Sequence, residues 1–145
     1  MTPTIGNFGP GPCGFTYNPG TALSPQYQDH FFMTNNKQEI RVFEFLPENA
    51  YFKFTEKESL KGGASNTGLA FGPDGGLYTA SYPGDGSIYR FAPQNQNALQ
   101  KSTQKILAQN ISECSISQLS QYLDHPDQRV RLKAQFEFVK RKQLK

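Results

Sequence analysis

The chain has 145 residues, which is the length of one ordinary domain able to bury a core. Hydrophobic residues make up 36% of it, and the formal net charge is +3. No apolar run approaches the ~20 residues that a membrane-spanning helix needs, and the stretch MTPTIGNFGPGPCGF lacks the basic and apolar regions of a signal peptide. We therefore expect no membrane span in this chain and no signal peptide in its first residues.

The composition changes near residue 95. All thirteen glycines and nine of the ten prolines precede that point, with six Lys/Arg and eight Asp/Glu. Residues 96–145 carry nine Lys/Arg and four Asp/Glu, a net charge of +5 against −2 for the first part. The basic end RVRLKAQFEFVKRKQLK is of a kind that attracts nucleic acid or anionic lipid, but a solvated helix face with a basic last turn explains it more simply. We expect two unlike parts and no nucleic acid partner.

The first part predicts short strands separated by turn residues. The expected strands are Phe15–Tyr17, Phe31–Asn35, Glu39–Leu46, Tyr51–Glu56, Thr67–Phe71, Gly76–Tyr82 and Ser87–Phe91. The turns GPDG (72–75) and PGDG (83–86) contain Asp-Gly, which supplies the positive φ angles of tight hairpins. The last three strands are therefore expected to form an antiparallel meander.

The two groups of strands resemble one unit written twice. GFTYNPG (14–20) matches GLAFGPDG (68–75), HFFMTN (30–35) matches GLYTAS (76–81), and EIRVFEF (39–45) matches SIYRFAP (87–93), at offsets of 54, 46 and 48 residues. Apolar residues fall on both faces of these strands, so each sheet needs cover on both sides. This pattern is typical of β-propeller blades, and predicts a partial propeller over residues 1–93 with blades at 14–60 and 66–92, the second incomplete. Since a propeller has about 4–8 blades, we expect the chain to be part of a larger one.

After residue 95 the apolar spacing becomes helical. Residues 94–114 predict a linker with a short helix near Lys101–Ala108. Two helices follow, capped by Ser115 and Asp127 and separated by His125-Pro126. Their apolar stripes are Ile116, Leu119 and Leu123 in the first helix, and Val130, Ala134 and Phe138, widened by Leu132, Phe136 and Val139, in the second. Residues 115–145 thus predict a HEAT-like helix pair, which needs a neighbour to cover its outer face.

Three segments, GPCGFTYNPGTALSPQYQDHFF, FGPDGGLYTASYPGDGSIYRF and LDHPDQRVRLKAQFEFVKR, carry a resemblance in this order. They resemble a family of large multidomain bacterial proteins described as membrane-bound-dehydrogenase-like or haem-binding. In that family a glucose/sorbosone-dehydrogenase-like β-propeller is followed by HEAT repeats and commonly by a c-type cytochrome module. The resemblance covers roughly residues 10–93 and 112–141, and implies the end of the propeller and the first HEAT unit.

For a full-length protein, the resemblance implies a quinoprotein-like sugar or alcohol oxidoreductase that is periplasmic or extracellular. Its implied cofactors are pyrroloquinoline quinone, calcium and haem c. The chain itself departs from that pattern. It has no CxxCH haem attachment motif, and Ser81 and Asn35 stand where such blades often carry Asp. Both changes remove the charge that a divalent cation or a catalytic base would use. We expect no catalytic residues, metal or cofactor in this chain.

The alternative interpretation is a non-catalytic propeller and HEAT scaffold that binds proteins or carbohydrate. The partners would be the missing blades and HEAT repeats of a longer chain, or other proteins. Because the strands are apolar on both faces, the isolated chain is expected to self-associate.

The acidic and glycine-rich loop motifs have structural explanations. GPGPCG (9–14) satisfies GxGxxG, but neither follows a predicted strand nor opens a helix, as a dinucleotide site requires. Asp74 and Asp85 give one carboxylate per loop, whereas calcium takes six to eight oxygens, so turn formation explains both.

The histidines and cysteines are expected to be structural. His30 follows Asp29 directly, and adjacent strand residues point to opposite faces, so they are not expected to form a catalytic pair. His125 precedes Pro126 in the helix turn, and two such histidines assemble no catalytic triad. Cys13 and Cys114 are the two cysteines of the chain, so a single disulfide is possible, but their spacing alone does not decide whether it forms. The sequon Asn110-Ile111-Ser112 is interpreted as incidental.

Overall fold

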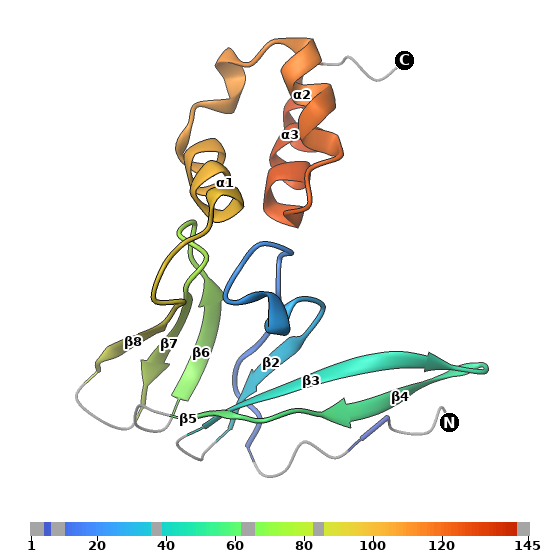
Figure 1. Ribbon diagram of the computed structural model, residues 1–145, viewed down its shortest axis with the longest axis vertical. Coiled ribbons are helices and arrows are strands. Elements are labelled where there is room, and N and C mark those ends of the chain that lie inside the picture. The colour runs from blue at the N-terminus through green and yellow to red at the C-terminus, as the bar shows by residue number, and fades with distance from the viewer. Residues whose placement is uncertain (1–4, 7–10, 36–38, 62–65, 83–85, 142–145) are drawn as a thin grey trace.

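The computed structural model describes residues 5–6, 11–35, 39–61, 66–82 and 86–141 of the chain. Its described residues form two antiparallel β-sheets followed by three α-helices (Figure 1). A mainly β fold with an α-helical C-terminal part is thereby confirmed.

The larger sheet has five strands. Strands β1 to β4 lie in chain order, and β5 pairs with the start of β3, on the same edge of β3 as β4. Their bounds are β1 (Phe15–Tyr17), β2 (Phe31–Thr34), β3 (Glu39–Glu48), β4 (Tyr51–Glu56) and β5 (Leu60–Lys61). The smaller sheet has the order β6 (Asn66–Phe71), β7 (Leu77–Ser81) and β8 (Ile88–Phe91). The seven expected strands are all present, and β3 runs two residues further than expected. Neither β5 nor the short 3₁₀-helix η1 (Pro25–Tyr27) was expected.

The β6–β7 connection is the tight turn that Asp-Gly predicts. Gly75 has φ +76° and donates its N–H to the Gly72 carbonyl at 3.0 Å. Asp74 accepts a hydrogen bond from the Gly76 N–H at 3.1 Å, which closes the turn locally. The expected meander of β6, β7 and β8 is confirmed.

The two sheets have the same strand register at the positions matched in the sequence. Phe15 of β1 pairs with Met33 of β2, and the matching Leu69 of β6 pairs with Thr79 of β7. In the next ladder the pairs that correspond are Phe31 with Phe43 and Leu77 with Phe91. Because register decides which side chains share a face, matched residues occupy matched places on the two sheets.

The main core lies between the two sheets. Phe32, Ile40 and Val42 of the larger sheet and Leu77 of the smaller one have no exposed surface. The Phe32 ring meets the Phe71 ring edge-on across the interface, with ring centroids 5.5 Å apart. Burying each such side chain contributes about 1.5–3 kcal/mol, so this face-to-face contact stabilises the β part.

The helices lie together beyond one end of the sheets (Figure 1). They are α1 (Ala98–Ala108), α2 (Ile116–Leu123) and α3 (Gln128–Lys140), with a 3₁₀ turn η2 (Ile111–Glu113) before α2. Ser115 forms a capping box at the start of α2, and the Asp127 side chain caps α3, both as expected. A small core of Cys114, Leu119, Ala134 and Phe138 joins α2 to α3. No helix in the described part of the chain has the length and apolarity to cross a membrane.

Two details of the helices differ from expectation. Helix α1 begins at Ala98, three residues before the expected start, because Asn97 and Gln100 form a capping box there. In α2 only Leu119 is buried, while Ile116 and Leu123 are exposed. Among the described elements, the short α2 packs mainly against α3, which covers one position of its apolar stripe.

Candidate interaction surfaces

The larger sheet carries a layer of aromatic side chains on the face turned away from the smaller sheet. Strand pairing places Tyr17 beside Phe31, and Phe45 beside Phe54. The rings touch: the Phe31 and Phe43 rings stack with centroids 5.8 Å apart. We call this surface the aromatic face; its members are Phe15, Tyr17, Phe31, Phe43, Phe45, Phe52 and Phe54.

Part of the aromatic face is open to solvent. Phe43 is fully buried under its neighbours, but Phe15 remains 57% exposed and Phe52 55% exposed. Both lie at positions where a sheet normally meets another layer. Exposed aromatic rings gathered on one surface mark a site for contact with another molecule or another part of the chain.

A cavity of about 470 Å³ indents the aromatic face beside the β3–β4 hairpin, which extends beyond the rest of the sheet (Figure 1). It is lined by Ile5, Tyr17, Asp29, Phe31, Glu44, Phe45, Leu46 and Phe52. The Tyr17 hydroxyl donates to Asp29 Oδ1 at 2.9 Å. Burial together with this hydrogen bond raises the pKa of Tyr17, so the hydroxyl stays protonated. Apolar side chains thus line the cavity together with the carboxylates of Asp29 and Glu44.

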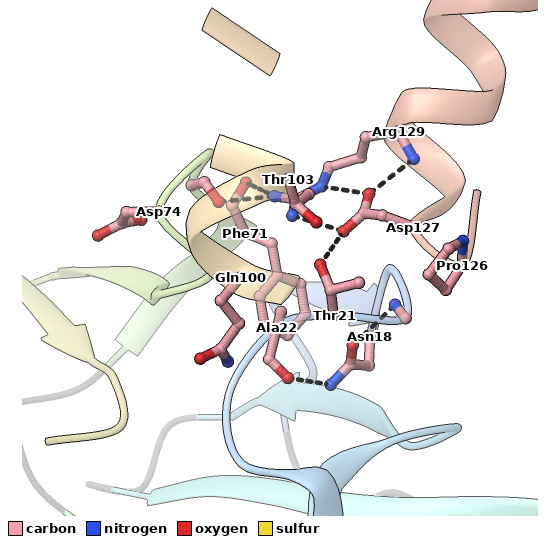
Figure 2. A network of polar contacts seen from close by, with 12 residues as sticks. Asn18, Thr21, Ala22, Phe71, Asp74, Gln100, Thr103, Pro126, Asp127 and Arg129 are labelled. Atoms are coloured by element: carbon pink, nitrogen blue, oxygen red, sulfur yellow. Dashed lines mark hydrogen bonds and ion pairs between the residues drawn. The ribbon is translucent and has the colours of Figure 1, made fainter. Parts of the chain in front are cut away.

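The interface between the helices and the sheets is a second contact region. There a network of polar contacts holds the helices against the loops of the sheets (Figure 2). At its centre the Asp127 carboxylate, 0% exposed, accepts from the Thr21 hydroxyl at 2.5 Å. Arg129 binds the same carboxylate through Nε and Nη2, at 2.9 and 2.8 Å. A third guanidinium nitrogen, Nη1, donates to the Gly72 carbonyl of the β6–β7 turn at 2.6 Å. We call Thr21, Gly72, Asp127 and Arg129 the polar joint.

The Asp127 carboxylate is ionised in the polar joint. Burial alone raises the pKa of Asp127, but the hydrogen bonds from Arg129 and Thr21 outweigh that effect, and the pKa falls below its ordinary value. A buried charge that is paired and hydrogen-bonded in this way holds its partners in one geometry.

Further contacts strengthen the attachment around the polar joint. The Gln128 N–H at the start of α3 donates to the Pro19 carbonyl at 2.7 Å. Gln100 of α1 donates through Nε2 to the Leu23 carbonyl at 2.6 Å. Asn18 holds the intervening loop by donating to the carbonyls of Ala22 and Tyr27, both at 2.9 Å. The loop over 18–23 is therefore fixed to α1 and to α3.

The structure gives each histidine a local partner. His30 Nδ1 lies 2.5 Å from the Gln28 carbonyl oxygen, and Asp29 bonds Tyr17 rather than His30. His125 Nδ1 accepts the Asp127 N–H at 3.0 Å in the turn before α3. Burial lowers the pKa of His125, which suits a neutral acceptor.

The acidic loop residue Asp74 binds within its own sheet. Besides its turn contact it accepts from the Tyr78 hydroxyl at 2.9 Å and from Arg90 Nε at 2.8 Å. Its expected role in the turn is therefore confirmed. Asp85, and Gly9 and Pro10 of the GxGxxG match, lie outside the described residues.

The cysteines and the sequon have clear positions. Cys13 is exposed and Cys114 is buried in the helical core, with no disulfide between them. Asn110 accepts from the Ser112 hydroxyl at 2.8 Å and caps η2. The side chain of Asn110 thus has a structural partner within its own turn.

Asn35 and Ser81, at the ends of β2 and β7, supply no carboxylate for a calcium site. Asn35 and Ser81 are buried, and the hydroxyls of Thr79 and Ser81 have no hydrogen-bond partner among the described residues. These groups are neutral, and the described part of the chain contains no group of three or more His, Cys, Asp and Glu placed to hold a metal ion. Calcium takes six to eight oxygens, usually with carboxylates among them.

The polar joint was not foreseen from the sequence. Thr21 and Asp127 are 106 residues apart, and no local pattern connects them. Only the capping position of Asp127 was visible. Comparison with protein-family models, curated proteins and solved structures finds no match for this chain.

Proposed function

We propose that this chain is a non-catalytic interaction module whose aromatic face packs against a further β-sheet of the same repeat. The observation that carries the proposal is the identical register of the two sheets. It allows the faces of one sheet to be matched with the faces of the other.

Matching faces of the two sheets differ in whether another sheet packs against them. In the smaller sheet, Leu69, Phe71 and Phe91 lie on the face that packs against the larger sheet. The positions that match them in the larger sheet are Phe15, Tyr17 and Phe43, which belong to the aromatic face. The face with which the second copy contacts the first is therefore the one that the first copy leaves partly open to solvent.

Repeating this contact adds one more sheet to the aromatic face, in the same orientation. A contact between two different faces of a repeated unit is head-to-tail, and such a series forms a ring when its successive rotations add up to a full turn. A ring of face-packed antiparallel sheets is a β-propeller. This supports the proposal of two blades, with the helix pair α2–α3 as a HEAT-like unit that follows them.

Within a longer protein the module would have a structural role. The three matching segments support a glucose/sorbosone-dehydrogenase-like, exported oxidoreductase as that protein. Calcium would then be held by other parts of it, because the described residues here include no group of three or more His, Cys, Asp and Glu placed to hold a metal ion. Haem c would also be held elsewhere, since this chain has no CxxCH motif. Pyrroloquinoline quinone belongs to the same proposal for the longer protein. This chain would supply sheet surface on one side and a rigid helical attachment on the other.

The test compares two charge substitutions at exposed aromatic residues. We expect the unaltered chain to self-associate in light scattering at tens of micromolar, a range in which exposed apolar surfaces commonly pair. Phe15→Glu, on the aromatic face, should shift the chain to a monomer, because a carboxylate there opposes desolvation. Tyr82→Glu is the matched control, since Tyr82 is 70% exposed but lies off that face, and it should leave association unchanged.

A well-behaved monomer of the unaltered chain, or equal effects of the two substitutions, would contradict the proposed docking surface. Separately, the purified chain supplied with pyrroloquinoline quinone, calcium and sugars should oxidise none of them. Sustained turnover would refute the non-catalytic role.

The cavity on the aromatic face favours a second candidate function, carbohydrate binding. Sugar rings stack on aromatic side chains while their hydroxyls bond to carboxylates, and here Tyr17, Phe31 and Asp29 line one cavity. Titration with mono- and disaccharides, followed by tyrosine fluorescence, tests this. The candidate requires a saturable signal that Asp29→Asn removes.

A further inference from the structure

We propose that the edge strand β8 accepts an extended segment of a partner as a fourth strand of the smaller sheet. This inference concerns another surface than the aromatic face and rests on different observations. They are the direction of the backbone groups of β8, the occupied equivalent place in the larger sheet, and a cavity beside the strand.

The hydrogen-bond pattern determines which groups of β8 point outward. Ser81 N–H donates to the Ser87 carbonyl at 3.0 Å, which marks residues 81 and 87 as a hydrogen-bonded pair. In an antiparallel ladder such pairs alternate, so Tyr89 and Phe91 also bond to β7. The backbone N–H and C=O groups of Ile88 and Arg90 then face away from β7. No strand of the described residues pairs with that side of β8.

The equivalent place in the larger sheet is occupied. Strand β3 matches β8 in sequence and register, and its far side is covered by β4 along residues 43–48 and by β5 along residues 39–40. The smaller sheet has the order β6-β7-β8, with nothing beyond β8 in the described chain. An open row of backbone groups of this kind is a template for another strand.

A cavity of about 460 Å³ lies at the end of β8 and can take side chains of an added strand. Apolar residues that line it are Leu23, Tyr27, Leu60, Phe91 and Pro93. On the opposite side of the strand, Ile88 is 72% exposed and offers a further apolar contact. Side chains of a strand alternate between faces, so one set would enter the cavity while the other covers Ile88.

The occupant is therefore an extended segment with apolar residues at alternate positions and no proline in the paired stretch. A second copy of β8 fits less well. Its own Tyr89 and Phe91 already belong to the inner face of its sheet, so they are not available to fill the cavity. Strand β4 is a segment of this kind, with Phe52 and Phe54 at alternate positions and no proline.

The experiment uses a capped peptide of residues 49–57, NAYFKFTEK, added to the ¹⁵N-labelled full chain at low concentration. In the free chain the amides of Ile88 and Arg90 should exchange with solvent readily, while those of Tyr89 and Phe91 are protected. The peptide should protect Ile88 and Arg90. A control peptide with N-methyl groups on Phe52 and Lys53, which block both of its edges, should have no effect.

Two variants separate backbone pairing from side-chain contact. Ile88→Pro removes one outward N–H without touching the β7 ladder, and should weaken peptide binding at least about tenfold. Ile88→Thr keeps the N–H and a β-branched side chain, and should bind within about threefold of the unaltered chain. Phe15→Glu should leave binding unchanged, so a failure here is distinguishable from failure of the proposed function.

Three results would overturn the proposal. The first is protection of Ile88 and Arg90 already in the free, dilute chain. The second is an absence of added protection at saturating peptide. The third is equal binding of the peptide by the proline and threonine variants.

Discussion

Among single residues, Asp127 links the two parts of the molecule most directly. Its carboxylate is fully buried, and its partners come from the loop after β1 and from α3. Removing one member of a buried ion pair is costly because the other charge is left without compensation. The Arg129 side chain keeps 23% of its surface exposed, so water can compensate part of that loss.

Asp127→Asn should therefore lower the free energy of unfolding by about 3 kcal/mol at pH 7, the lower end for buried pairs. The pKa of Asp127 is lowered in the folded state, so its contribution is present above the unfolded pKa near 4 and is lost as pH falls through the lower folded pKa. The difference between the two proteins should narrow from pH 5 toward pH 2, as measured by urea denaturation. If the free energies of unfolding of the two proteins differed by the same amount at every pH in that window, ionisation of Asp127 would contribute nothing to stability.

At Gly20 the loop over 18–23 lies against the turn that precedes α3. Its φ is +115°, and a Cβ placed there would overlap the Pro126 carbonyl oxygen. Gly20→Ala combines a disfavoured backbone conformation with a clash against backbone, so it should lower the free energy of unfolding by about 2 kcal/mol or more. Gly68→Ala is the control, because a Cβ at Gly68 meets nothing within 4 Å and its φ is ordinary. Thermal unfolding that shifts equally for both variants would contradict this account.

Of the elements, α3 shows how one helix can carry two apolar stripes with different roles. Val130, Ala134 and Phe138 are buried, the last two in the helical core, whereas Leu132, Phe136 and Val139 lie on the exposed side. Phe138→Ala should lower the free energy of unfolding by about 3 kcal/mol, because it empties a packed site. Phe136→Ala, at a side chain 67% exposed, should change it by less than about 0.5 kcal/mol. Urea denaturation of the pair measures both, and a similar loss in each would mean that the exposed stripe is covered in solution.

Much of the secondary structure was predictable because local chemistry determines it. Asp-Gly turns and strand alternation located β6, β7 and β8 to within about one residue, and the Ser115 and Asp127 caps located the starts of α2 and α3. Strand β5 was missed because two residues, Leu60 and Lys61, give no periodic signal. The polar joint and the open side of β8 depend on how distant segments meet, and no pattern within a short window contains that information.

For the whole molecule, the main consequence of the polar joint is that sheets and helices should unfold as one unit. The helical core is small, and its apolar contacts alone leave α2 and α3 marginal. The contacts to Gly72, Pro19 and Leu23 connect that core to the loops of both sheets. Breaking them exposes polar groups that the other part had satisfied, so neither part can open without cost to the other.

This coupling predicts coincident unfolding transitions from two probes. Six of the seven tyrosines lie before residue 95, so tyrosine fluorescence reports mainly on the sheets, while circular dichroism at 222 nm reports mainly on the helices. In urea the two transitions of the unaltered chain should superimpose.

Arg129→Ala removes the bonds to Asp127 and Gly72. It should separate the two unfolding transitions, with the helices unfolding first. Ser115→Ala is the control: it weakens the α2 cap by about 1 kcal/mol without touching the polar joint, so both transitions should move together. Separate transitions in the unaltered chain would mean that the polar joint aligns the two parts without coupling their stability.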